Sequence, residues 1–265
     1  MEQQAYIDLQ DVTLSYGEEG AEQTLALEHT TLKVAKGEFI AVVGTSGCGK
    51  SSLMKLVTGL IPPTSGKLAV NGKTVTRPIQ GVGMAFQSST LMPWRNTLGN
   101  IMLPLEIVEP YKRRLRQDRK QHIEKAEVLL ASVGLKGLGK KFPWELSGGM
   151  QQRASLCRAL IHSPDLLMLD EPFGALDAFT REELWDVMQN LWLDRRFTAI
   201  LVTHDLREAV YLADTVYVMS ARPGRILHAK RVDIPRPRSL QTSFEPRFVD
   251  IVQELREHIG HEHSR

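Results

Sequence analysis

Short, continuously apolar segments recur along the chain, and amphipathic stretches separate them. Such runs, when polar residues or glycine bound them, are typical of strands buried on both faces of a parallel sheet. The clearest examples are Glu38–Gly44, Leu166–Asp170, Thr198–Asp205 and Thr215–Ser220. Strand and helix patterns that alternate at this spacing favour an α/β fold with a mainly parallel sheet.

The N-terminal and middle segments have different patterns. Apolar and polar residues alternate loosely from Ile7 to Tyr16, which predicts antiparallel strands ahead of a turn at Gly17–Gly20. Between about 88 and 162 no strong strand pattern occurs, whereas residues 112–133 and 150–161 have helical patterns. We interpret residues 88–162 as a helical subdomain that is inserted in the sheet domain.

The C-terminal segment begins with the connector PRPR at 235–238, and the apolar positions after it mark one face of a final helix. We therefore expect one domain over 1–230 and an extension with one amphipathic helix over 231–265. A frayed tail is the simplest interpretation of the last residues, and metal binding is the alternative. The histidines that raise this alternative are His258, His261 and His263.

The charges of the chain nearly balance. Its 33 Lys and Arg against 31 Asp and Glu give a formal net charge of +2, which argues against a nucleic-acid partner. The two cysteines, Cys48 and Cys157, suit a reducing compartment. Neither an export signal at Met1 nor a run of about 18 apolar residues occurs. We expect a cytosolic chain that other chains bring to any membrane where it works.

A phosphate-binding loop follows the first buried strand. The sequence GTSGCGKS has the Gly-x-x-x-x-Gly-Lys-Ser pattern between a strand and a helix, the context in which backbone N–H groups surround phosphate oxygens. Lys50 can reach the β- and γ-phosphates, and the Ser51 hydroxyl can ligate Mg²⁺. A glycine-rich turn with an incidental lysine is the alternative. The predicted nucleotide contacts are Gly44, Thr45, Ser46, Gly47, Cys48, Gly49, Lys50, Ser51 and Ser52.

Two carboxylates follow a later strand. The run LLMLDE delivers Asp170 at a strand's carboxyl end, where open α/β sheets bind ligands and where Asp170 can hold Mg²⁺. Glu171 can then orient or deprotonate a water that attacks the γ-phosphate. Two solvated acids at a strand end are the alternative, but the loop at Lys50 favours function. Together these motifs predict a nucleoside triphosphatase.

The motif LSGGM at 146–150 narrows the class. With it, the chain from about Ile7 to Ile226 resembles the ATP-binding cassette family of transport ATPases. The resemblance implies a P-loop NTPase (RecA-like) core, an N-terminal antiparallel β subdomain, an inserted α-helical subdomain, and the cofactors ATP and Mg²⁺. It also implies a homodimer in which Ser147, Gly148 and Gly149 face the γ-phosphate that a second copy holds. An isolated Ser-Gly-Gly is otherwise an ordinary turn.

Four more residues match this family's pattern. Tyr16 corresponds to an aromatic residue that stacks on adenine, although a core residue at a strand end is the alternative. Gln87 corresponds to a glutamine that contacts Mg²⁺ and the attacking water, and Asp177 to a loop that crosses the dimer interface. His204 corresponds to a histidine that contacts the γ-phosphate, with a helix cap or core residue as the alternative.

One residue departs from the pattern, because the motif ends in Met150 where the family usually has glutamine. Methionine cannot complete the Ser-x-x-Gln capping box, which should cost about 0.5 to 1 kcal/mol of stability at the helix start. This cost is too small to abolish nucleotide binding.

Further segments resemble the importer branch that serves nitrate, sulfonates and taurine: EPFGALDAFTR from Glu171, ARPGR from Ala221 and LMPWRN from Leu91. This resemblance implies transmembrane permease subunits as partners, an extracytoplasmic solute-binding protein as an indirect partner, and a location at the cytoplasmic face of the membrane. Met92 and Trp94 fit either a partner contact or a core. An exporter cassette, a soluble cassette ATPase and a P-loop kinase are the rival functions.

Overall fold

The computed structural model describes residues 5–17 and 23–260. Most of the turn predicted at Gly17–Gly20, and both His261 and His263, lie outside the described residues. The chain divides into two compact units, which we describe separately. Unit 1 comprises Met1–Ile79 and Thr198–Arg265, and unit 2 comprises Gln80–Phe197.

Unit 1 contains an antiparallel sheet that is built from the N-terminal segment. Its strands lie in the order β2-β1-β4-β5, and β1 pairs antiparallel with both β2 and β4. The apolar residues of β1 that alternate in the sequence, such as Ile7, Leu9 and Leu14, are buried. The bounds of these strands are β1 Ile7–Tyr16, β2 Thr24–Val34, β4 Ser65–Val70 and β5 Lys73–Thr74.

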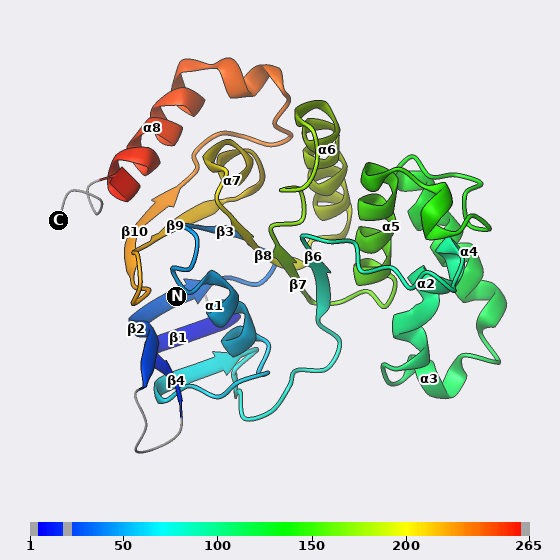
Figure 1. Cartoon of the computed structure of the whole chain (residues 1–265), viewed down its shortest axis with the longest axis horizontal. Helices are drawn as coiled ribbons and strands as arrows, with labels where there is room; N and C mark the ends of the chain where they lie inside the picture. The colour runs from blue at the N-terminus through cyan, green and yellow to red at the C-terminus, as the bar shows by residue number, and fades with distance from the viewer. Residues whose placement is uncertain (1–4, 18–22, 261–265) are drawn as a thin grey trace. The chain divides into compact units, whose positions relative to one another are not determined.

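Unit 1 also contains parallel strands that carry the continuously apolar runs. Strand β3 (Phe39–Val43) pairs in parallel with β8 (Thr198–Thr203) and with β9 (Thr215–Met219). All residues of β3 and β8 are buried, as expected of strands covered on both faces. Strand β10 (Ile226–Arg231) pairs antiparallel with β9 and lies beside it in Figure 1.

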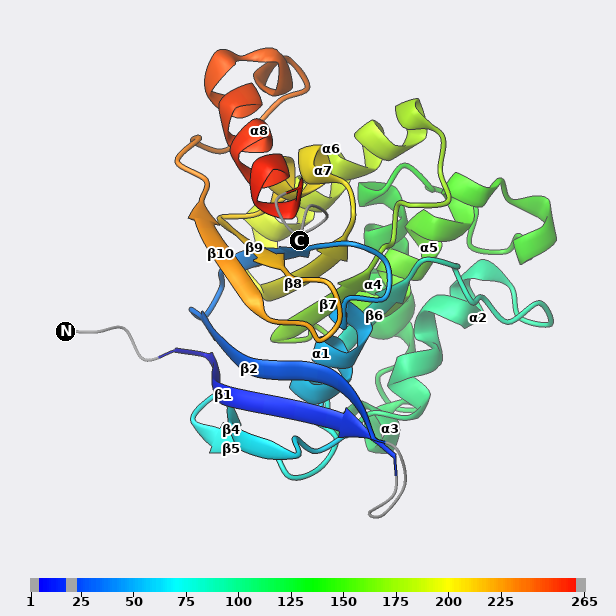
Figure 2. The same ribbon diagram turned by 60° about the vertical axis from the view of Figure 1, so that its left-hand side comes forward.

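The helices of unit 1 follow these strands. Helix α1 (Lys50–Val57) comes after β3, and α7 (Leu206–Leu212) comes after β8. A 3-10 turn, η3 (Gln241–Phe244), leads to α8 (Pro246–Gly260). Helix α8 contacts α7, β9 and β10 (Figures 1 and 2). Its residues Phe248, Ile251 and Leu255 are buried.

A buried arginine fixes the connector that leads to α8. Arg238 donates hydrogen bonds to the carbonyl oxygens of Val210, Ala213 and Ile234. Burial lowers the pKa of Arg238 to about 9, which still leaves the side chain charged at neutral pH. Carbonyl oxygens at the end of α7 therefore find a donor inside the protein, as buried polar groups require.

Unit 2 has two parallel strands and several helices. Strands β6 (Gly83–Phe86) and β7 (Leu166–Asp170) pair in parallel. The helical pattern at 112–133 forms two helices rather than one, because the chain turns at residues 115–118. Trp185 and Trp192 of the last helix are buried. The helix bounds are α2 Thr97–Met102, η1 Leu103–Glu106, α3 Tyr111–Arg114, α4 Arg119–Ser132, η2 Pro143–Glu145, α5 Gly148–Leu160 and α6 Ala178–Arg195.

Candidate active site

The loop between β3 and α1 has the backbone that an anion-binding loop needs. Gly47 has φ of 78° and Gly49 has φ of 105°, in the left-handed region that glycine enters without steric cost. Gly49 is the N-cap of α1, and the helix begins at Lys50. A loop of this kind turns its N–H groups to one side at the positive end of the helix dipole.

Close packing leaves no space for side chains at two of the glycines. A Cβ added to Gly44 would lie 2.8 Å from the Met219 carbonyl oxygen and 2.9 Å from Cys48 Sγ. One added to Gly49 would lie 2.8 Å from Leu27 Cδ2. The loop is therefore held from outside by the ends of neighbouring strands, as well as by its own conformation.

Gly224 is a positioning residue that the sequence analysis did not single out. A Cβ at this position would overlap the Cys48 carbonyl oxygen, so the chain passes directly against the loop. The Gly224 N–H donates to the Ala26 carbonyl oxygen at 3.0 Å, and its own carbonyl accepts from the Glu28 N–H at 2.9 Å. From the sequence alone, the motif ARPGR indicates only a branch of the family. The contact of its Gly224 with Cys48 joins distant segments, so the sequence does not reveal it.

Lys50 lies inside the loop. Its Nζ donates to the carbonyl oxygens of Gly44 and Thr45, each at 2.9 Å, and lies 3.8 Å from Cys48 Sγ. Burial raises the pKa of the Cys48 thiol, and the nearby Lys50 charge opposes this only in part. The thiol is therefore protonated at neutral pH, and a small packing residue is the better interpretation of Cys48 than a redox group.

Tyr16 and His204 complete the predicted residues of unit 1. Tyr16 is 38% exposed, and its hydroxyl lies 3.1 Å from Ser52 Oγ at the start of α1. His204 is exposed and directly follows β8. Because Val43 and Thr203 are paired in register, His204 and the phosphate-binding loop begin at the same edge of the sheet. Asp205, and not His204, caps the next helix.

In unit 2, three predicted residues gather where two strands end. Phe86 is opposite Asp170 in the β6–β7 register, so Gln87 and Glu171 leave the sheet together. Gln87 Nε2 and Glu171 Oε2 both approach Gly174, at 3.5 Å and 3.8 Å from a Cβ added there. Glu171 itself has φ of 46°, which is unusual for a residue with a side chain. Amide and carboxylate groups therefore meet at this edge.

The Ser-Gly-Gly motif starts helix α5. Ser147 is the N-cap, and its Oγ accepts a hydrogen bond from the Met150 N–H at 3.3 Å. The bond from the Met150 N–H to the Ser147 side chain, which is one half of a capping box, is therefore present. The other half, a bond from the Ser147 N–H to the side chain of residue 150, is missing because that residue is methionine. In the part of the chain that the structure describes, no atom lies within 4 Å of a Cβ added to Gly148, whereas one added to Gly149 would lie 2.6 Å from Thr180 Cγ2.

Asp177 caps helix α6 beside this motif. Its carboxylate accepts from the Thr180 N–H at 3.0 Å and from the Thr180 hydroxyl at 2.7 Å. These hydrogen bonds lower the pKa of Asp177, with the backbone bond the largest cause. Thr180 thus touches both motifs, and a hollow of about 280 Å³ is lined by Ser147, Gly149, Thr180 and neighbouring residues.

Helix α5 is also fastened to the segment that follows β6. Gln152 donates from Nε2 to the Phe86 carbonyl oxygen at 2.8 Å, and Ser89 Oγ donates to Gln151 Oε1 at 3.1 Å. Arg158 donates to the carbonyl oxygens of Ser89 and Thr90. We call these three residues of α5 the clamp. They are functional candidates that motif spacing alone did not reveal.

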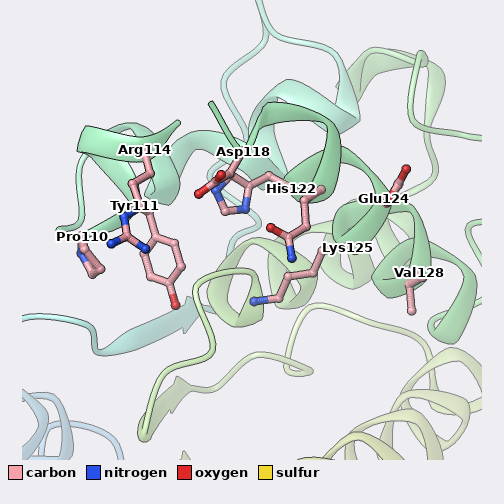
Figure 3. Close-up of a pocket in the computed structure, with 9 residues that line it drawn as sticks. Pro110, Tyr111, Arg114, Asp118, His122, Glu124, Lys125 and Val128 are labelled. Carbon is pink, nitrogen blue, oxygen red and sulfur yellow. The ribbon is translucent and has the colours of Figure 1, made fainter. Parts of the chain in front are cut away.

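A second hollow, of about 490 Å³, lies between α3 and α4 in unit 2. Figure 3 shows Lys125 reaching toward the Tyr111 hydroxyl, with His122 and Asp118 between the two helices. Arg114 and Lys125 are balanced by Asp118 and Glu124 in the lining, so the hollow has no net attraction for a phosphate. We assign it no part in the nucleotide site.

Comparison with known proteins identifies the class. Residues 27–174 match the family model described as ABC transporter. The chain belongs to this family, as the sequence predicted, and is an ATPase that serves transmembrane transport.

Among its relatives are two proteins named aliphatic sulfonates import ATP-binding protein SsuB. That of Bacillus licheniformis is 44% identical over 83% of this chain and 82% of its own length. That of Bacillus subtilis is 41% identical over 86% of this chain and 85% of its own. An uncharacterized ABC transporter ATP-binding protein of Methanocaldococcus jannaschii is 43% identical over 83% of this chain and 79% of its own.

Two solved structures are also similar. The ATP-binding cassette MJ0796, in a dimeric post-hydrolysis state bound to ADP and Pi, has a TM-score of 0.70 and 25% identity, covering 86% of this chain and 100% of its own. A second dimeric structure of MJ0796 has a TM-score of 0.71 and 27% identity over the same shares. These similarities confirm the predicted fold class.

The packing of Gly224 generates the first prediction. In Gly224→Ala, the methyl group should push the Cys48 carbonyl out of place and weaken ATP binding at least tenfold, or ~1.4 kcal/mol. Titration with a fluorescent ATP analogue measures this. Gly137→Ala is the control, because alanine would be strained at its φ of 80° although no described atom lies within 4 Å of the added Cβ. Equal affinity in both variants would contradict the positioning role.

The contact between Gly149 and Thr180 generates the second prediction. Gly149→Ala should lower the free energy of unfolding by about 1–3 kcal/mol, because the methyl groups overlap and the Thr180 hydroxyl bond to Asp177 restricts rotation. Thr180→Ser removes Cγ2 and keeps the hydroxyl, so the double variant should recover most of the loss. Urea unfolding of the unchanged chain, the two single variants and the double variant measures the coupling energy between positions 149 and 180. Additive losses would show that this contact is not the cause.

Proposed function

We propose that this chain is the ATP-hydrolysing subunit of an importer for a small solute of the sulfonate, nitrate or taurine kind. The relatives that are named for aliphatic sulfonate import support this substrate class. The observation that carries the ATPase role is the glycine loop at Lys50, whose backbone packs against Met219 at Gly44 and against Leu27 at Gly49. The solute itself would be selected by other chains.

Within each chain, residues 44–52 would bind the triphosphate and Tyr16 would stack on the adenine. The donor set fits Mg²⁺, because the Ser51 hydroxyl, the Gln87 amide oxygen and the Asp170 carboxylate are hard oxygen ligands. When bound, Mg²⁺ neutralises charge on the β- and γ-phosphates. Lys50 would contribute a further positive charge at the same oxygens.

Glu171 would orient the attacking water and accept its proton, and His204 would donate a hydrogen bond to the γ-phosphate. The strand-end position of Glu171, near Gln87 and Gly174, supports this role because one amide and one carboxylate can hold one water. The left-handed φ of Glu171 supports it further, since strained backbone is concentrated at sites that do chemistry.

A second copy of the chain would complete the site. The N-terminus of α5 presents the exposed residues Ser147 and Gly148, a hydroxyl and backbone N–H groups at the positive end of a helix. These groups would face the γ-phosphate bound by the partner, with Gly149 beside them and Asp177 at the interface. Related cassettes form dimers, which supports this arrangement.

Membrane permease subunits would dock on the segment 91–96. Asn100 is buried and orders this segment, because its Nδ2 donates to the carbonyl oxygens of Met92 and Arg95, and its Oδ1 accepts from the Met92 N–H. Trp94 nevertheless remains 73% exposed on this ordered loop. An aromatic side chain presented in this way is typical of an interface anchor.

The location at the cytoplasmic face of the membrane would follow from this docking, with an extracytoplasmic solute-binding protein as an indirect partner. None of the helices in the described ranges has the length and apolar character needed to cross a bilayer. Residues 1–230 would then act as the ATPase domain and 231–265 as an extension to it.

Replacing the catalytic carboxylate tests the chemistry. In Glu171→Gln, ATP should bind with unchanged affinity while phosphate release falls about 10²-fold or more, the usual scale for the loss of a general base. Phosphate release and nucleotide binding are measured on the same preparation. Glu257→Gln, an exposed change on α8, serves as the control. Turnover near the normal rate in Glu171→Gln would refute the assignment.

Gly148→Ala tests the shared site. Among the described residues, nothing lies within 4 Å of the added methyl group, so the Tm should be unchanged. If the partner's nucleotide approaches this position, ATPase activity should fall more than tenfold. The loss of ATPase activity in Gly148→Ala should persist when Thr180→Ser is added. The loss of stability in Gly149→Ala, by contrast, should be largely recovered by Thr180→Ser. Full activity of Gly148→Ala, at every protein concentration, would end the dimer proposal.

A further inference from the structure

Three metal-ligating side chains meet where helix α8 lies along strand β10 (Figure 1). His228 comes from β10, and Glu254 and His258 are one turn apart on α8. One ligand atom from each lies within 4.8 Å of the others. Residues four apart share one face of a helix, so both helical side chains can point to the strand.

Two of the ligand atoms already have the separation that a metal would impose. His228 Nε2 and Glu254 Oε1 are 3.4 Å apart. Two ligands of a tetrahedral zinc ion, at about 2.0–2.1 Å from it, lie roughly 3.3–3.4 Å apart. Among the described residues, His228 Nε2 is buried and makes no well-aligned hydrogen bond, although Glu254 Oε1 lies 3.4 Å away. A metal between the two atoms would give this nitrogen a directed bond.

The third ligand is held nearby by ring stacking. The imidazoles of His228 and His258 stack with centroids 3.9 Å apart and an angle of 15° between their planes. Parallel rings cannot both direct a nitrogen lone pair at one ion, so the His258 ring must tilt. His258 is in the last turn of α8 and is not fully buried, so it can make this rotation.

The surrounding charges keep the carboxylate ready to ligate. Lys230 Nζ donates a hydrogen bond to Glu254 Oε2 at 2.5 Å. Lys230 therefore binds one carboxylate oxygen and leaves the other facing His228, as a supporting residue does around many metal sites. Arg247, another cation near Glu254, forms an ion pair with Asp233.

We propose that His228, Glu254 and His258 bind a zinc ion, with water as the fourth ligand, and that this ion fastens the C-terminal helix to the edge of the sheet. Two imidazoles and one carboxylate form a ligand set that zinc prefers. The site contains none of the proposed nucleotide-binding residues, so it goes beyond the ATPase function.

Calorimetric titration of the full chain with zinc sulfate, without nucleotide, tests the proposal. One zinc ion should bind per chain and raise the Tm. His258→Ala changes only the end of a helix, so it should fold normally, bind zinc at least tenfold more weakly and lose the rise in Tm. Glu254→Gln keeps the shape of the side chain and should have the same effect. Cobalt(II) should give the absorption bands of a tetrahedral site.

The double variant His261→Ala/His263→Ala is the matched control, because it removes two other histidines of the same tail. It should bind zinc as the unchanged chain does. Absence of zinc binding in the unchanged chain would overturn the proposal. So would binding that disappears in the control and survives in His258→Ala, since the metal would then belong to the tail alone.

Discussion

The loop between β3 and α1 depends on one constraint, which is that backbone N–H groups can surround an anion only where no side chain intervenes. Glycines satisfy the local part of this constraint, at Gly47 and Gly49. Distant residues satisfy the rest, because Met219 at the end of β9 and Gly224 in the connection to β10 pack against the loop. The conformation of the phosphate-binding loop thus depends on distant parts of unit 1 as well as on its own glycines.

In unit 2, too, glycines occupy positions where a side chain would not fit or would cover backbone N–H groups. Helix α5 begins with two glycines next to its Ser147 cap, and the neighbouring α6 begins with the Asp177 cap. Thr180 lies between them and leaves no room for a side chain at Gly149. Polar groups at helix starts and strand ends therefore define the chemistry that the described part of unit 2 can offer.

Motif spacing and apolar runs predicted much of this arrangement. Uninterrupted apolar runs identified the buried strands, and the position of each motif after a strand or before a helix identified the candidate residues. Contacts between distant segments could not be predicted in this way. Gly224 against Cys48, Asn100 beneath the loop of Trp94, and His228 opposite Glu254 all depend on how elements pack, and the pattern at 112–133 did not reveal the turn within it.

The clamp on α5 has a mechanical consequence. Gln151, Gln152 and Arg158 hold the backbone and side chains of 86–90, so the chain on either side of Gln87 cannot shift without carrying the Ser147 end of α5 with it. A displacement of the segment 86–90 would therefore be passed to helix α5. In the proposed importer, these hydrogen bonds would couple the segment that leads to the permease with the helix that begins at Ser147.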